Sequence, residues 1–248
     1  MLELLAVAAA GAAAGASNSL AGAGSLITFP TLVALGVPPL SANVTSTVGL
    51  IPGAAGGAIG YADLLGEQRR RVLRLAIPTL FGAVAGTALL LITASDTFEA
   101  IVPALVAGSC LLLLFQPRLT ARITGAGDEH SPLLSAGLVF SGAYAAYFGS
   151  AVGILLLGLL GLFVADSMQH LNGLKILLAG LANLLAATAY AFLADVNWRF
   201  AVCLMVSSLI GGRLGANLAR RVSGDALRVA IALVGLVVAA VLAWQAFG

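Results

Sequence analysis

Charge is what this sequence has least of. Asp, Glu, Lys and Arg make up 9% of its 248 residues, while 60% of the residues are hydrophobic. Soluble globular domains carry about 25% charged residues. So little charge excludes a soluble domain of this length and predicts a polytopic membrane protein. Helices satisfy their own backbone hydrogen bonds in lipid, so we expect mostly helix.

Cysteine and histidine are also scarce, with two of each. Cys110 and Cys203 lie inside apolar runs, which favours buried free thiols over a disulfide. Neither their spacing nor the histidines indicate a metal site, and we expect no cofactor. Basic residues lack interleaved aromatics, which argues against nucleic-acid binding. Gly-x-Ser-Gly, His-Glu-x-x-His and paired intramembrane Asp residues are missing as well, so the sequence does not indicate an enzyme.

The apolar runs fall into two classes by length. A membrane-crossing helix needs about 20 apolar residues, which fits the runs 40–65, 75–93, 98–115, 168–193, 198–221 and 226–247. Two shorter runs, 24–37 and 152–164, contain Gly or Pro and follow the apolar runs 1–21 and 133–149. Short interrupted segments mark the binding sites of many transporters. Each pair predicts a re-entrant hairpin, and two full crossings by short helices are the alternative.

The second half of the chain repeats the first at an offset of 129 positions. The offset aligns scarce residue types without a gap: Asn43 with Asn172, Tyr61 with Tyr190, Arg70 with Arg199, and Asp96 with Asp225. Such matches are informative because these residue types are rare in this sequence. We therefore predict an internal duplication. The first repeat covers 1–121, a cytoplasmic linker covers 122–131, and the second repeat covers 132–248.

The basic turns predict opposite orientations for the two halves. Lys and Arg in short loops favour the cytoplasmic side. The basic turn of the first half is 69–74, whereas that of the second half, 220–228, is the counterpart of the turn around Asp96, which has no Lys or Arg. This is the pattern of an inverted repeat. The expected fold is an all-α polytopic inner-membrane protein of two inverted repeats. Each repeat is a short broken or re-entrant helical hairpin plus three transmembrane helices, with both termini outside.

The hairpin tips are expected to meet near the membrane midplane. Each tip precedes a half-helix whose N-terminus offers unpaired N–H groups and a positive dipole end. Two such ends can hold a small anion, and glycine lets it approach the backbone. Tight helix packing is the alternative role of these glycines, and we prefer it for Gly82, Gly86, Gly211 and Gly215. The candidate tip residues are Ser19, Gly22, Gly24, Ser25, Gly149, Ser150 and Gly153.

Polar side chains of the long spans extend the candidate site. Asn43 and Ser46 share one helix face, and Asn172 and Lys175 share a face of the equivalent span. Pore lining and interhelical hydrogen bonding are both open for the asparagines. We expect Lys175 to snorkel to the membrane surface, with anion attraction as the alternative. Arg213 leans away from the nearer end of its span, which favours a place in the anion path.

Two motifs carry a family resemblance. Gly22-Ala-Gly24-Ser25-Leu-Ile-Thr-Phe-Pro30 and Ser41-Ala42-Asn43-Val-Thr45-Ser46-Thr47 resemble the first-repeat signature of the TauE/SafE-like permeases, also called the sulfite exporter or sulfonate permease family. The duplicated layout extends the resemblance over nearly the whole chain. In the second half, Pro30 has no proline counterpart and Asn172 is followed by Gly-Leu-Lys.

The resemblance implies a secondary transporter, either an exporter or a permease. Its substrates would be small sulfur-containing anions such as sulfite or organosulfonates, moved across the inner membrane. A membrane channel and a non-transporting membrane partner protein are the alternatives, and an intramembrane enzyme is the least favoured. Proton or ion coupling and homo-oligomer formation are left open by the sequence.

Overall fold

The computed structural model describes residues 1–20, 22–59, 61, 66, 68–120, 127–218 and 224–247. All regular structure in these ranges is helical, which confirms the predicted class. The first half contains α1 (Leu2–Leu20), α2 (Ser25–Ala34), α3 (Pro39–Ile59), α5 (Arg69–Ile92) and α6 (Ser95–Thr120). The second half contains α7 (Pro132–Tyr147), α8 (Val152–Phe163), α9 (Met168–Leu193), α10 (Trp198–Leu218) and α11 (Gly224–Phe247).

Helix length separates two kinds of element. Within the described ranges, α5, α6 and α9 are long and apolar enough to cross a membrane. In contrast, α2 has 10 residues and α8 has 12. At about 1.5 Å per residue they extend roughly 15 and 18 Å, about half of a ~30 Å hydrocarbon core. The two short apolar segments predicted from the sequence are therefore present as short helices.

The boundaries of several helices differ from the expected ones. α9 begins and ends as predicted, but α5 begins at Arg69. The stretch predicted as a basic turn, 69–74, therefore forms the first turns of α5, because arginine is a good helix former. α6 continues to Thr120, into the predicted hydrophilic connector. Residues 121–126 and 219–223, which include much of the linker and of the second basic turn, lie outside the described residues.

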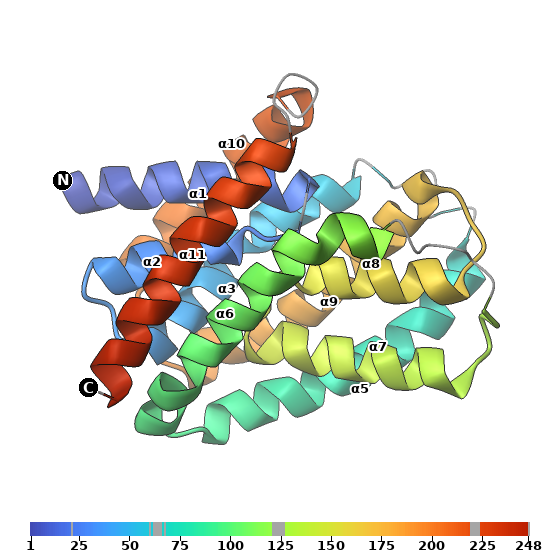
Figure 1. The fold of residues 1–248 in the computed structure, drawn as a ribbon, viewed down its shortest axis with the longest axis horizontal. Helices are drawn as coiled ribbons and strands as arrows, with labels where there is room; N and C mark the ends of the chain where they lie inside the picture. The colour runs from blue at the N-terminus through green and yellow to red at the C-terminus, as the bar shows by residue number, and fades with distance from the viewer. Residues whose placement is uncertain are drawn as a thin grey trace.

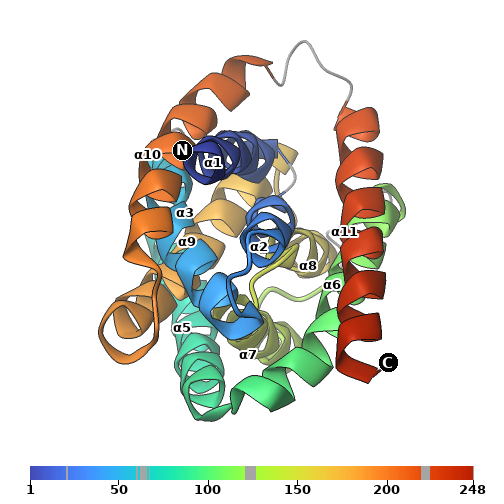
Figure 2. The same ribbon diagram turned by 90° about the vertical axis from the view of Figure 1, so that its left-hand side faces the viewer.

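The two short helices lie in the middle of the molecule. In Figure 1, α1 and α2 form a hairpin that enters from the end holding both termini, and α7 and α8 form one that enters from the opposite end. Figure 2 views the molecule along its long axis and shows α2 and α8 surrounded by the longer helices. The tips of both hairpins are therefore enclosed by protein.

Helix pairing joins the two halves. α1 packs against α10, and α5 packs against α7; α3 also contacts α10, and α5 contacts α9. The 129-residue offset aligns α1 with α7 and α5 with α10. Each of these pairs therefore has a counterpart in which the halves exchange places. The pairs α3–α9 and α6–α11 join equivalent helices directly.

Glycines allow the helix backbones to touch in the pairs α1–α10 and α5–α7. A Cβ added at Gly82, Gly86 or Gly211 would overlap a backbone oxygen of the facing helix. Only glycine fits such a contact, so the predicted packing role is confirmed at these positions. The surroundings of Gly215 are not among those the structure describes.

A charged cluster joins the ends of several helices. The Arg71 guanidinium donates to both oxygens of Glu129, at 2.8 and 3.0 Å, and to Asp166 at 2.6 Å. Asp166 also bonds His170 Nδ1 at 2.6 Å. Partial burial favours a higher pKa for Glu129, but the hydrogen bond and charge of Arg71, with the charge of Arg74, outweigh it and lower that pKa. Glu129 therefore keeps its negative charge at neutral pH.

We expect Gly86→Ala to destabilise the protein, because the new methyl group would overlap the carbonyl of Ala143 in α7. Overpacking of this kind costs about 1–3 kcal/mol. Gly108→Ala in α6 is the matched control, since a Cβ there meets nothing within 4 Å. Thermal unfolding in detergent measures both variants. A melting temperature of Gly86→Ala equal to that of Gly108→Ala would contradict the close α5–α7 contact.

Candidate functional site

The helices that lead into the two tips end in the same way. Gly22 and Gly149 have φ values of 68° and 73°, a conformation that glycine adopts without strain. The N–H of Gly22 donates to the carbonyl of Ser17 at 3.2 Å, and that of Gly149 to the carbonyl of Tyr144 at 2.9 Å. These bonds close α1 and α7, and the chain then turns back into α2 and α8.

The two tips touch each other. A Cβ added to Gly22 would lie 3.0 Å from the Cα of Gly153, so the two backbones meet at these glycines. The hydroxyls of Ser25 and Ser150 are 3.0 Å apart and share a hydrogen bond. The prediction that the tips meet is confirmed, and it brings the N-terminal ends of α2 and α8 together.

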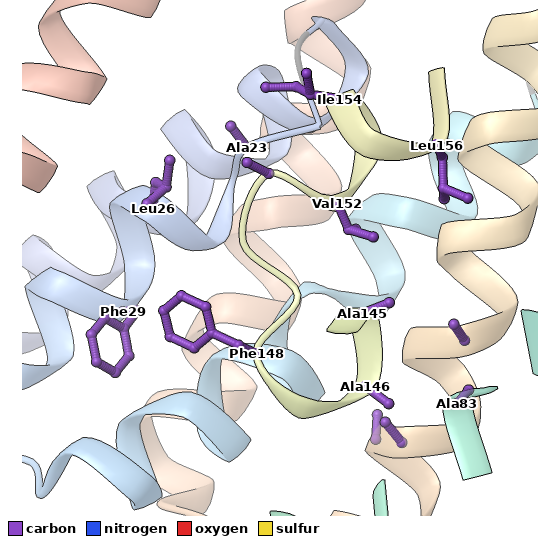
Figure 3. Close-up of a cluster of buried hydrophobic side chains, with 14 of the residues drawn as sticks. Ala23, Leu26, Phe29, Ala83, Ala145, Ala146, Phe148, Val152, Ile154 and Leu156 are labelled. Atoms are coloured by element: carbon purple, nitrogen blue, oxygen red, sulfur yellow. The ribbon is translucent and has the colours of Figure 1, made fainter. Parts of the chain in front are cut away.

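Apolar side chains enclose the tips on one side. Figure 3 shows Phe29 and Phe148 facing each other, with Ala23 of the first tip and Val152 at the start of α8 above them. The two rings meet edge to face, with centroids 5.5 Å apart and an interplanar angle of 78°. All four residues are buried. Water is excluded from this side, which strengthens electrostatic interactions within the site.

A cavity of about 80 Å³ adjoins the tips. It has room for a few water molecules or one small anion. Residues from both tips and from α3 and α9 line it. The candidate residues in this lining are Gly22, Ser25, Gly149, Gly153 and Lys175.

Lys175 is the charged residue of the cavity lining. Its side chain is 2% exposed, and its Nζ donates to Asn172 Oδ1 at 3.0 Å. No carboxylate of the described residues forms an ion pair with it. The expectation of snorkelling is wrong. A Cβ on Gly153 would lie 3.5 Å from Lys175 Cδ, which is an ordinary van der Waals contact, so the lysine side chain packs beside the second tip inside the protein.

Two candidate residues, Gly24 and Asn43, do not line the cavity but form hydrogen bonds within and to the tips. The N–H of Gly24 donates to Asn18 Oδ1 at 2.8 Å, so this group is already bonded within the first tip. Asn43 in α3 donates to the carbonyl of Tyr147 at 2.9 Å. This bond ties the first half of the chain to the second tip, which is the interhelical role that the sequence left open for Asn43.

The other candidate residues are distributed around the cavity. Asn172 accepts a hydrogen bond from the Lys175 ammonium, and Ser150 shares a hydrogen bond with the hydroxyl of Ser25. Ser46 is buried and shares a hydrogen bond with a threonine of α2. Arg213 is exposed on α10 and does not line the cavity. The side chain of Ser19 lies outside the described part of the structure.

The candidate residues chosen from the sequence omitted three polar side chains of the lining: Asn18, Thr47 and Asn183. Asn183 lies 11 positions after Asn172, which is three helical turns along the same face of α9. This spacing predicts that Asn183 continues the face of Asn172 and Lys175, although it was not among the candidate residues. Asn18 lies within the first tip, but nothing in the sequence distinguishes its role from that of the neighbouring serines.

Comparison with known proteins identifies a family and several relatives. The chain matches the model of the family described as Sulfite exporter TauE/SafE over residues 7–242. It is 26% identical to the probable membrane transporter protein YfcA of Escherichia coli strain K12, over 95% of this chain and 87% of that protein. It is 25% identical to the probable membrane transporter protein ORF9 of a Sinorhizobium species, over 91% of this chain and 87% of that protein. A probable membrane transporter protein of Haemophilus influenzae is 26% identical, over 81% of this chain and 79% of that protein.

We expect Lys175→Met to stabilise the protein in the absence of an anion. Methionine fills a similar volume without burying a charge, and replacing buried charges by packed apolar groups can stabilise by roughly 1–4 kcal/mol. Lys175→Arg keeps the charge and is the control. The melting temperature in detergent, measured without added anion, tests this. A lower melting temperature of Lys175→Met than of wild type would contradict the presence of an uncompensated buried ammonium.

Proposed function

This chain belongs to the sulfite exporter TauE/SafE family of membrane transporters, and we propose that it moves small sulfur-containing anions, sulfite or organosulfonates, across the inner membrane. One observation carries the proposal: the cavity brings the buried Lys175 together with the N-terminal ends of two half-helices. All three contributions are positive, and the described lining contains no carboxylate. Such a site favours an anion.

The chemistry of the proposed ligand suits the groups that surround the cavity. Sulfite and sulfonates carry several acceptor oxygens. The Lys175 ammonium and the Ser25 hydroxyl are donors in the cavity lining, and the positive dipole ends of α2 and α8 lie beside them. Hydrogen bonds to charged groups contribute roughly 1.5–3 kcal/mol each. A few of them give weak binding that permits release, which a transporter requires. Gly22, Gly149 and Gly153 let the anion approach the backbone.

The proposal includes an inverted repeat around this cavity. Two features support it: the hairpins enter from opposite ends of the molecule, and the helix pairs α1–α10 and α7–α5 exchange the two halves. In such transporters one repeat rocks against the other while the site stays at the centre. The end of α5 that bears the arginines would face the cytoplasm, and both termini would lie outside.

Uptake of labelled sulfite into liposomes tests the transport activity. Liposomes that contain wild-type protein should accumulate more label than empty liposomes. Lys175→Met should bind sulfite about 10- to 100-fold more weakly, because one charge-assisted hydrogen bond is lost. Gly158→Ala is the control, since a Cβ at this position of α8 meets nothing within 4 Å. Wild-type uptake no greater than that of empty liposomes would contradict sulfite transport. Normal uptake by Lys175→Met would place the anion elsewhere.

Cysteine labelling tests the inverted topology. Gly66 and Asp195 are both exposed and are related by the 129-residue offset. In a background without Cys110 and Cys203, a membrane-impermeant thiol reagent should reach Gly66→Cys only from the cytoplasmic side and Asp195→Cys only from outside. Labelling of both cysteines from the same side would exclude the inverted repeat.

A further inference from the structure

A second cavity, of about 140 Å³, lies between α3 and α9. It shares Ile51, Ala54, Ile176 and Gly180 with the lining of the cavity at the tips, so the two adjoin. A Cβ added to Gly180 would meet nothing within 4 Å, which leaves open space where they meet. We call this second cavity the apolar annex. The residues that line only the annex are Ala55, Ala58, Leu177, Leu181 and Leu184.

The two adjoining cavities differ in chemistry. The tip cavity has Lys175, hydroxyl and amide groups, whereas every side chain that lines the annex is apolar or absent. An inorganic anion such as sulfite would use the tip cavity alone. The annex would add nothing to the binding of such an ion, because it offers no hydrogen-bond donor from a side chain.

We propose that the anion carried by this protein is amphipathic: its sulfonate-type head lies at Lys175 and the tips, and a short alkyl chain lies in the annex. This rests on the proposed function and narrows its substrate class. The size of the annex, about 140 Å³, limits the length of the chain. Ala58 and Leu181 then determine how long a chain the site accepts.

Burial of the chain sets the size of the expected effect. Each methylene moved from water into an apolar site improves affinity about fourfold. Affinity should therefore rise along a homologous series until the annex is full. Leu184 at the annex is 48% exposed, so a lipid acyl chain is the competing occupant. A lipid that filled the annex would remove the dependence on alkyl length.

Calorimetric titration in detergent with sulfite, methanesulfonate, propanesulfonate, butanesulfonate and octanesulfonate tests the proposal. Wild-type protein should bind propane- and butanesulfonate more tightly than methanesulfonate, by about fourfold per methylene, with no further gain at octanesulfonate. Equal affinities along the series, or sulfite as the tightest ligand, would overturn the annex proposal.

Two variants alter the annex in opposite directions. Ala58→Leu narrows it and should reduce butanesulfonate affinity at least tenfold, while methanesulfonate affinity changes by less than twofold. Leu181→Ala widens it and should move the maximum affinity to longer chains. Ala88→Leu makes the same change as Ala58→Leu on the exposed face of α5 and should leave the whole series unchanged.

The results separate this inference from the proposed function. If no anion of the series binds, sulfite included, the proposed function is contradicted. If sulfite binds and is transported but chain length has no effect, only the annex proposal fails. The annex proposal would also be overturned if Ala58→Leu weakened the binding of every ligand equally at an unchanged melting temperature. The effect of the substitution would then not depend on the alkyl chain.

Discussion

A buried positive charge without a carboxylate partner is the constraint around which this structure is arranged. The ammonium of Lys175 is almost fully buried, and its hydrogen-bond partner is the neutral amide of Asn172. The N-terminal ends of α2 and α8 add two further positive ends of helix dipoles. These three contributions repel one another when the cavity holds only water. The charge balance of the site is therefore complete only when an anion is present, which links binding to stability.

The two half-helices impose a second requirement. Unpaired backbone groups within a membrane cost several kcal/mol each unless protein or a wet cavity satisfies them. The surrounding helices meet this requirement because the glycine contacts of α5 and α10 draw them close to the hairpin helices. Some tip groups are satisfied locally, as when Gly24 donates to Asn18. Other N–H groups at the start of each half-helix bond carbonyls of the same tip, as Leu26 does with Ala23 and Ile154 with Ala151.

The sequence predicts the features that depend on local pattern. Interrupted apolar runs predicted the two short helices. Because Asn, Tyr, Arg and Asp are scarce, their matches at an offset of 129 residues indicated the repeat. The burial of Lys175 could not be predicted in this way, because its side chain packs beside Gly153 of another helix. The role of Gly24 was likewise hidden, since its N–H is bonded by a side chain of its own tip. The annex depends on two helices at once, and Gly180 alone does not indicate it.

Divergence between equivalent positions explains how a duplicated chain can make an asymmetric site. At the 129-residue offset, Ser46 corresponds to Lys175, and Ala54 corresponds to Asn183. Lysine at both positions of the first pair would bring two like charges into the protein interior, where their repulsion is stronger than in water. One lysine and one serine avoid this repulsion. The same divergence leaves part of α3 apolar where it faces α9, so the charge lies at the tips and the apolar surface lies beside them.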